Sequence, residues 1–166
     1  ATCSPCPIRF QGGQMRPLSQ RIERAHLVIA DSGVHGSTRE AVGALRRRYE
    51  EDTGTVGPLI GSLGALTRTA IAALNDGDAP ALGAAMNRAH AVLAELGLSL
   101  PILDGLTGAA RRAGALGAKL TGGGLGGCTI ALADGPGTAE RIRAELERAG
   151  AAATWTYRMR VSEADG

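Results

Sequence analysis

The sequence predicts an α+β fold, a ferredoxin-like split β-α-β sandwich in which helices cover one face of an antiparallel sheet. Three observations predict it. The 166 residues suit a single domain, and 44% of them are hydrophobic, as in globular proteins. Short β-branched runs and segments of helical period follow one another as strand, helices, strand, strand, helix and strand. A run with five glycines in six residues separates the two middle strands.

The first half of the chain predicts one buried strand followed by long helices. Residues 27–31 are a short apolar run closed by Ser-Gly, which is typical of a buried strand. Ser37 and Glu40 have the spacing of a capping box, so a helix is expected to begin there and to end near residue 52. Further helices are expected over 59–74 and, capped by Asp78, up to about residue 96.

The second half predicts a helix, two strands, a helix and a strand. Their expected ranges are 101–114, 116–121, 128–133, 138–149 and 154–161. In the last strand apolar residues alternate with polar ones, which predicts one buried face made of Trp155, Tyr157, Met159 and Val161. His90 lies one position beyond the apolar stripe of its helix, where a surface or boundary histidine is expected.

The glycine loop consists of Gly122, Gly123, Gly124, Gly126 and Gly127, with Leu125 between them. Glycine loses the most backbone entropy on folding, so such a run is kept where positive φ angles or a close approach is needed. Its spacing matches G-x-G-x-x-G, but a strand follows it where a dinucleotide site requires a helix. Three uses remain open: an anion site of backbone amides with Lys119 nearby, close passage of another loop, or a plain tight connection.

Composition excludes several classes of protein. A net charge of +2 and 2% aromatic residues argue against a nucleic-acid binder. The C-x-x-C at Cys3 and Cys6 lacks the further ligands of a zinc site, so no metal site is expected. No apolar stretch approaches the ~20 residues of a membrane span, and no signal peptide is visible. These features predict a cytoplasmic protein without a membrane partner, and they leave a homodimer open.

Several stretches together carry a resemblance to a known family. Residues 114–128, G-A-L-G-A-K-L-T-G-G-G-L-G-G-C, resemble the third conserved motif of the GHMP family of small-molecule kinases, and mevalonate kinases in particular. Residues 30–33, 36–40, 86–90 and 103–104 are similar to mevalonate kinases in order and spacing. The resemblance covers nearly the whole chain.

The resemblance implies ATP-dependent transfer of the γ-phosphate to the primary hydroxyl of mevalonate, a step in isoprenoid precursor synthesis. Residues 21–166 would be the C-terminal domain of such a kinase, and residues 1–20 would continue a strand and turn from a missing N-terminal domain. The nucleotide loop, the ligands of Mg²⁺ and the catalytic aspartate would belong to that half, the aspartate just upstream of Ala1. No catalytic or metal-binding residue is then expected in this chain, and the chain alone is expected to be inactive.

The resemblance also assigns roles within the chain. The five glycines of the glycine loop would support the nucleotide loop at the phosphate end of the cleft. Thr38 and Ser37 would face mevalonate, although for Ser37 helix capping is the favoured interpretation. Two alternatives stay open: another GHMP kinase, such as phosphomevalonate or homoserine kinase, or a catalytically silent ferredoxin-like module for binding or assembly.

Overall fold

Four antiparallel strands form the central sheet of the computed structural model, which describes residues 7–162. The strands are β3 (His26–Asp31), β4 (Gly117–Leu120), β5 (Cys128–Ala133) and β6 (Ala153–Arg158). Their order across the sheet is β4-β5-β3-β6, and every neighbouring pair is antiparallel. The first of these strands in the chain thus lies between the third and the fourth, which confirms the predicted split β-α-β arrangement.

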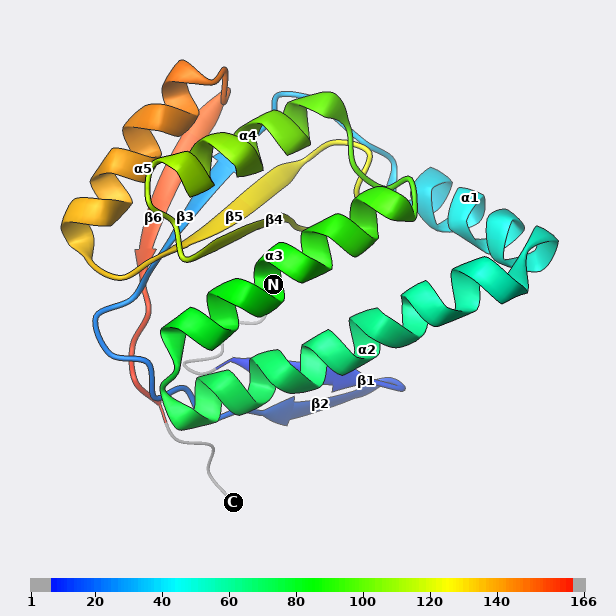
Figure 1. Ribbon diagram of the computed structural model, residues 1–166, viewed down its shortest axis with the longest axis horizontal. Helices are drawn as coiled ribbons and strands as arrows, with labels where there is room; N and C mark the ends of the chain where they lie inside the picture. Colours follow the sequence, from blue (N-terminus) through cyan, green and yellow to red (C-terminus); the bar gives the residue numbers. More distant parts are fainter. Residues whose placement is uncertain (1–6, 163–166) are drawn as a thin grey trace.

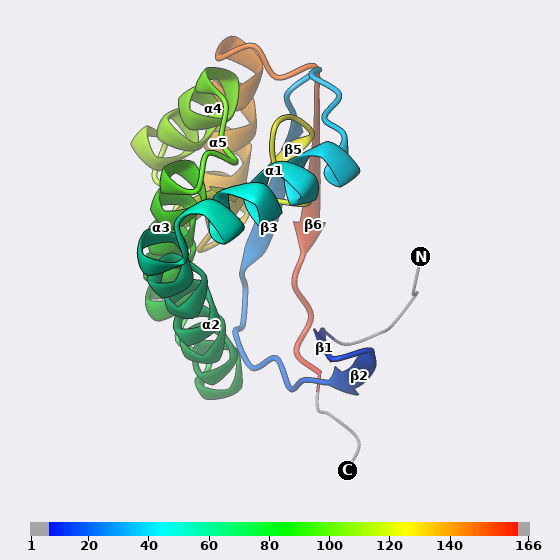
Figure 2. The same ribbon diagram turned by 90° about the vertical axis from the view of Figure 1, so that its right-hand side faces the viewer.

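The described chain contains five helices, which lie on one face of the sheet, along one edge of it and beyond that edge (Figures 1 and 2). They are α1 (Thr38–Glu51), α2 (Thr53–Asp76), α3 (Ala79–Glu95), α4 (Pro101–Arg112) and α5 (Pro136–Arg148). Figures 1 and 2 show α4 and α5 over one face of the sheet, α3 along the β4 edge, and α2 outside α3. The helices of the first crossover therefore extend the domain sideways, beyond the two-layer sandwich.

Side chains that the sequence marks as caps begin two of these helices. The hydroxyl of Ser37 accepts a hydrogen bond from the amide of Glu40 at 3.3 Å. The carboxylate of Asp78 accepts one from the amide of Ala81 at 2.9 Å. Each cap satisfies a first-turn amide that has no partner within its own helix, so these two helix starts are set locally.

The main core lies between the sheet and the pair α4 and α5. Val28 and Ala30 of β3 are completely buried there, against Leu106 of α4 and Ile142 of α5. Alanines supply most of the remaining contacts, and their small side chains let both helices lie close to the sheet. A second cluster joins α2 and α3 to the sheet through Ile22, Ala73, Leu82, Met86, Leu132 and Met159.

The outer strand β6 departs from the sequence prediction. Trp155 and Tyr157 are 52% and 54% exposed, Val161 is 53% exposed, and only Met159 of the alternating set is buried. Alternation with a period of two places side chains on one face, but it does not show that anything covers that face. Here α4 and α5 lie against the other face, so the aromatic side of β6 is uncovered within the described chain.

A separate hairpin precedes the sheet. Its strands β1 (Ile8–Gln11) and β2 (Gln14–Pro17) pair across the predicted turn, with Phe10 opposite Met15. Phe10 is 70% exposed and Met15 is 58% exposed. Figure 2 shows the hairpin apart from the four-stranded sheet. A two-stranded hairpin gains little stability alone, so its apolar side chains are not explained by packing within this domain.

Helix α2 differs from the prediction that no stretch is long and apolar enough to cross a membrane. Its 24 residues meet that criterion by length and composition, and little of the helix is buried. The helix packs lengthwise on α3 and meets α1, and Ala73 and Val56 are its buried residues. Its apolar character comes from alanine, leucine and isoleucine, interrupted by four glycines and one arginine.

Candidate functional site

The glycine loop joins β4 to β5 at one end of the sheet. The amide of Thr121 donates to the carbonyl of Cys128 at 2.9 Å and closes the base of the loop. A shallow open depression of about 360 Å³ lies over it. Its lining is Gly36, Thr38, Thr121, Gly122, Gly123, Gly124, Gly126, Gly127 and Cys128. Glycine backbone therefore makes most of the surface of this depression.

Three of the loop glycines are needed because other segments pass close to them: backbone at Gly124 and Gly126, and the side chain of Thr38 at Gly123. A Cβ on Gly124 would lie 2.3 Å from the carbonyl oxygen of Leu98, and one on Gly126 would lie 2.5 Å from that of Val34. A Cβ on Gly123 would meet the side chain of Thr38 at 3.0 Å. Real Cβ atoms do not approach carbonyl oxygens this closely, so the loop can pack here only without side chains. The predicted close passage of another segment is thus found inside this chain.

The other two glycines are open. Gly122 and Gly127 have φ angles of +82° and +76°, and a Cβ on either would meet no heavy atom within 4 Å. Their positive φ angles favour glycine without any packing reason. Both line the depression, so this part of the loop is accessible to a ligand or to another chain segment.

Several loop amides point to no acceptor within the described chain. The amides of Leu125 and Gly127 donate to the carbonyls of Leu98 and Val34, at 2.9 and 2.7 Å. Those of Gly122 and Gly123 have no such partner among the described residues. Unpaired amides of successive residues in a tight loop can bind an anion. The chemistry available at the depression is therefore hydrogen-bond donation to negatively charged oxygen.

The two predicted substrate residues are placed differently. Ser37 is the N-cap of α1, where its hydroxyl serves the amide of Glu40. Thr38 is the first residue of α1, is exposed, and lines the depression beside Gly123. The structure therefore places Thr38 beside the glycine loop, whereas Ser37 serves as the helix cap of α1. The start of α1 also places the positive end of a helix beside the depression.

Lys119 does not line the depression. Its ammonium donates to the carbonyl oxygen of Leu120 at 2.6 Å, and burial of the side chain lowers its pKa. The only lysine of the chain is therefore occupied by backbone just ahead of the glycine loop. Residues 7–162 contain no group of three or more histidine, cysteine, aspartate or glutamate side chains that could hold a metal ion.

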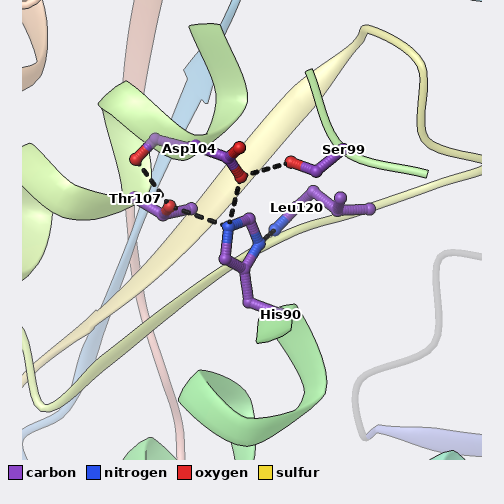
Figure 3. Close-up of polar contacts among 5 residues, drawn as sticks. All are labelled: His90, Ser99, Asp104, Thr107 and Leu120. Carbon is purple, nitrogen blue, oxygen red and sulfur yellow. Dashed lines mark hydrogen bonds and ion pairs between the residues drawn. The ribbon is translucent and has the colours of Figure 1, made fainter. Parts of the chain in front are cut away.

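His90 is where the sequence interpretation is wrong. The side chain was expected at the surface or boundary, but it is only 4% exposed. Figure 3 shows it between α4 and β4, with the amide of Leu120 on one ring nitrogen and Asp104 and Thr107 on the other. The apolar stripe of α3 could not show this, because the partners come from residues 14 to 30 positions further along the chain.

Comparison with known families supports the fold and the loop together. The family described as GHMP kinases C terminal matches residues 70–152, a stretch that contains α3, α4, α5 and the glycine loop. Mevalonate kinase of Pyrococcus abyssi is 42% identical over 129 residues, which are 75% of this chain and 38% of that protein. Mevalonate kinase of Pyrococcus horikoshii is 38% identical over 148 residues, 86% of this chain and 43% of that protein.

Solved structures give the same result. The L. major mevalonate kinase crystallised with R-mevalonate has a TM-score of 0.87 and is 28% identical, covering 95% of this chain and 49% of that one. The phosphomevalonate kinase of Streptococcus pneumoniae has a TM-score of 0.74 at 15% identity, covering 88% of this chain and 43% of that one, which shows a shared fold alone. The chain thus spans about two fifths to one half of the length of these relatives.

Proposed function

The chain belongs to the GHMP kinases, whose C-terminal domain it matches in sequence and fold, and from this we propose that it is the C-terminal half of an ATP-dependent mevalonate kinase. The proposed reaction transfers the γ-phosphate of ATP to the primary hydroxyl of mevalonate. The observation that carries this proposal is the depression of unpaired glycine amides beside the first turn of α1. We also propose a cytoplasmic location for this kinase.

The acceptor is inferred from the named relatives. The curated relatives at about 40% identity are mevalonate kinases, whereas the phosphomevalonate kinase structure is only 15% identical to this chain over the matched region. A phosphomevalonate or homoserine kinase therefore has weaker support than a mevalonate kinase. A silent assembly module would account for the exposed apolar side chains, but it would leave the open depression at the glycine loop without a use.

In this proposal the glycine loop supports the phosphate end of the nucleotide. ATP would supply the phosphoryl group, and Mg²⁺ would neutralise charge on its phosphates. The loop fits a phosphate, because the amides of Gly122 and Gly123 have no partner among the described residues and because Gly122 and Gly127 border the depression with open space beside them. The described residues offer no cluster of ligands for Mg²⁺, so we assign its ligands to the other half of the kinase.

Thr38 is proposed to contact the acceptor. Its hydroxyl lies at the rim of the depression and its backbone belongs to the first turn of α1. A hydroxyl there can donate to or accept from an oxygen of mevalonate, and the helix end favours the substrate's negative charge. Ser37 contributes the cap that holds this turn in place.

We assign the uncovered surfaces of the chain to contact with the N-terminal half. The β1-β2 hairpin exposes Phe10 and Met15, and β6 exposes Trp155 and Tyr157. Exposed apolar side chains grouped on one element commonly mark an interaction site. Residues 1–20 would then belong to the junction between the halves, and residues 21–166 to the C-terminal domain.

The proposal is tested with the complete kinase, made from the gene that encodes this chain. Mevalonate-dependent formation of ADP is measured for the parent protein, for Thr38→Ala and for Thr67→Ala, an exposed threonine of α2, as the matched control. Thr38→Ala is expected to lower kcat/KM for mevalonate about tenfold, the effect of one lost hydrogen bond, without changing the melting temperature. Turnover of another acceptor but not of mevalonate would refute the substrate, and no turnover of any acceptor would refute the kinase.

A further inference from the structure

The edge strand β4 has backbone groups that its neighbour β5 does not satisfy. Side chains of α3 satisfy them. Asn87 accepts a hydrogen bond from the amide of Ala118 at 3.0 Å and donates to the carbonyl of Leu116 at 3.3 Å. His90 accepts one from the amide of Leu120 at 3.2 Å through Nδ1. Helix α3 thus occupies the place of a fifth strand and protects the sheet edge.

Two glycines allow α3 to come this close. A Cβ on Gly83 would lie 2.5 Å from the carbonyl oxygen of Leu116, and one on Gly117 would lie 2.0 Å from that of Gly83. Gly83, Asn87 and His90 are separated by four and then three residues, so they share one face of the helix. This face contacts β4 and the residue before it from Gly83 to His90, and His90 is the contact nearest the glycine loop.

The other side of the His90 ring is also held. Nε2 lies 3.0 Å from a carboxylate oxygen of Asp104 and 3.0 Å from the hydroxyl of Thr107. Asp104 is itself held by the hydroxyl of Ser99 at 2.6 Å, as Figure 3 shows. Because the Leu120 amide can only donate, Nδ1 must be unprotonated, and the ring proton must lie on Nε2 facing Asp104. The partners therefore select one neutral tautomer.

We propose that His90 is a positioning residue, which holds the glycine loop in place through the backbone of Leu120. Leu120 is the last residue of β4, two positions before Gly122. Its amide is held by His90 and its carbonyl by the ammonium of Lys119. Both groups that set the direction of the chain into the loop are thus fixed by side chains. The effect on nucleotide binding rests on the proposed function, whereas the effect on the loop does not.

Two substitutions of His90 distinguish the hydrogen bond at Nδ1 from the hydrogen bond at Nε2. His90→Asn keeps an acceptor at the position of Nδ1, so it retains the bond to Leu120 and loses the one to Asp104. His90→Gln places its amide at the position of Nε2, so it retains a partner for Asp104 and loses the one for Leu120. Both variants remove the aromatic ring and leave a polar side chain of reduced volume. A merely structural role predicts similar defects in both.

Amide hydrogen exchange of the 166-residue chain, followed by NMR, distinguishes these cases. His90→Gln is expected to speed exchange at the Leu125 and Gly127 amides about tenfold relative to Val28 in β3, the effect of one lost hydrogen bond. His90→Asn is expected to leave that ratio within about twofold, because the Leu120 bond remains. The inference would be overturned if the exchange rates of the Leu125 and Gly127 amides changed equally in the two variants. It would also be overturned if the exchange rate at Val28 changed as much as theirs. ¹⁵N shifts of the parent ring that place the proton on Nδ1 would overturn it as well.

The complete kinase then tests the consequence for function. His90→Gln is expected to raise KM for ATP about tenfold with a smaller change in kcat, and His90→Asn is expected to restore most of the loss. If loop exchange responds as expected and KM for ATP does not, His90 holds the loop but the proposed nucleotide role of the loop is wrong. If loop exchange shows no difference between the variants, the inference fails whatever the activity.

Discussion

Replacing Gly124 by alanine should destabilise the chain far more than replacing Gly122. The two residues have almost the same φ angle, +81° for Gly124 and +82° for Gly122. They differ in surroundings, because a Cβ on Gly124 would lie 2.3 Å from the carbonyl oxygen of Leu98, whereas one on Gly122 would meet nothing within 4 Å. Comparing the two substitutions therefore distinguishes the effect of close packing on stability from the effect of backbone strain.

The expected free energies of unfolding follow from these contacts. Both substitutions place an alanine in the left-handed region, which costs about 1 kcal/mol. Gly124→Ala also overpacks backbone, for about 1–3 kcal/mol, and displaces the hydrogen bond from Leu125 to Leu98, for about 1 kcal/mol. The loss should be about 3–5 kcal/mol for Gly124→Ala and about 1 kcal/mol for Gly122→Ala.

Thermal unfolding followed by circular dichroism measures this difference. In a chain of this length 1 kcal/mol corresponds to about 2–4 °C, so the melting temperature should fall by roughly 10 °C for Gly124→Ala and roughly 3 °C for Gly122→Ala. In the complete kinase the order should reverse for binding, since Gly122→Ala intrudes into the depression and should raise KM for ATP. Equal melting temperatures in the two variants would refute the packing described for the loop.

Three further outcomes are expected. Asn87→Leu should lower the free energy of unfolding by about 2–4 kcal/mol in a urea titration, because the amide of Ala118 in β4 and the carbonyl of Leu116 just before it lose their partner. Burial lowers the pKa of His90 below its ordinary value of about 6.5, despite the opposing effect of Asp104, so the unfolded chain binds a proton at a higher pH than the folded one. Stability should therefore fall as the pH drops below about 6.5, and this fall should be weaker in His90→Asn. Trp155→Ser should change the stability of the isolated chain by less than about 0.5 kcal/mol, but weaken association with the N-terminal half about tenfold in a pull-down or titration.

Each of these outcomes has a matched comparison. Arg88→Leu, at an exposed position of α3, is the control for Asn87→Leu, and equal losses would show that the backbone bonds are unimportant. An unchanged pH dependence in His90→Asn would assign the acid sensitivity to other groups. Val42→Ser, at an exposed position of α1, is the control for Trp155→Ser, and equal affinities would remove the aromatic side of β6 from the interface.

Much of the fold could be predicted because its signals are local. The caps Ser37 and Asp78 satisfy amides three residues away, so their function depends only on nearby sequence. The glycine loop was recognised between two strands, since the apolar run of β5 has the wrong length and composition for a helix. The predicted order of strands and helices agrees with the observed sheet, because few sheet topologies join these elements without crossed connections.

The candidate site could be predicted only in part. Sequence reasoning placed Thr38 near the substrate by resemblance, and the structure brings it beside Gly123, more than 80 positions along the chain. It could not show that Gly123, Gly124 and Gly126 are packed within this chain while Gly122 and Gly127 are open. That distinction depends on carbonyls of Val34 and Leu98, which become neighbours of the loop only after folding.

The sequence by itself determined the class of fold, the starts of α1 and α3, the glycine loop and the family, because each is a pattern of adjacent or periodically spaced residues. The start of α2 was expected at residue 59 but lies at Thr53, where Asp52 caps the helix. Only the tertiary structure decided which surfaces are covered. It placed His90 inside the protein, between Asp104 and the amide of Leu120, although its helical period suggested the boundary. It also left Trp155 exposed, although its alternation suggested a core. Periodicity fixes the direction in which a side chain points, and burial depends on which distant element packs there.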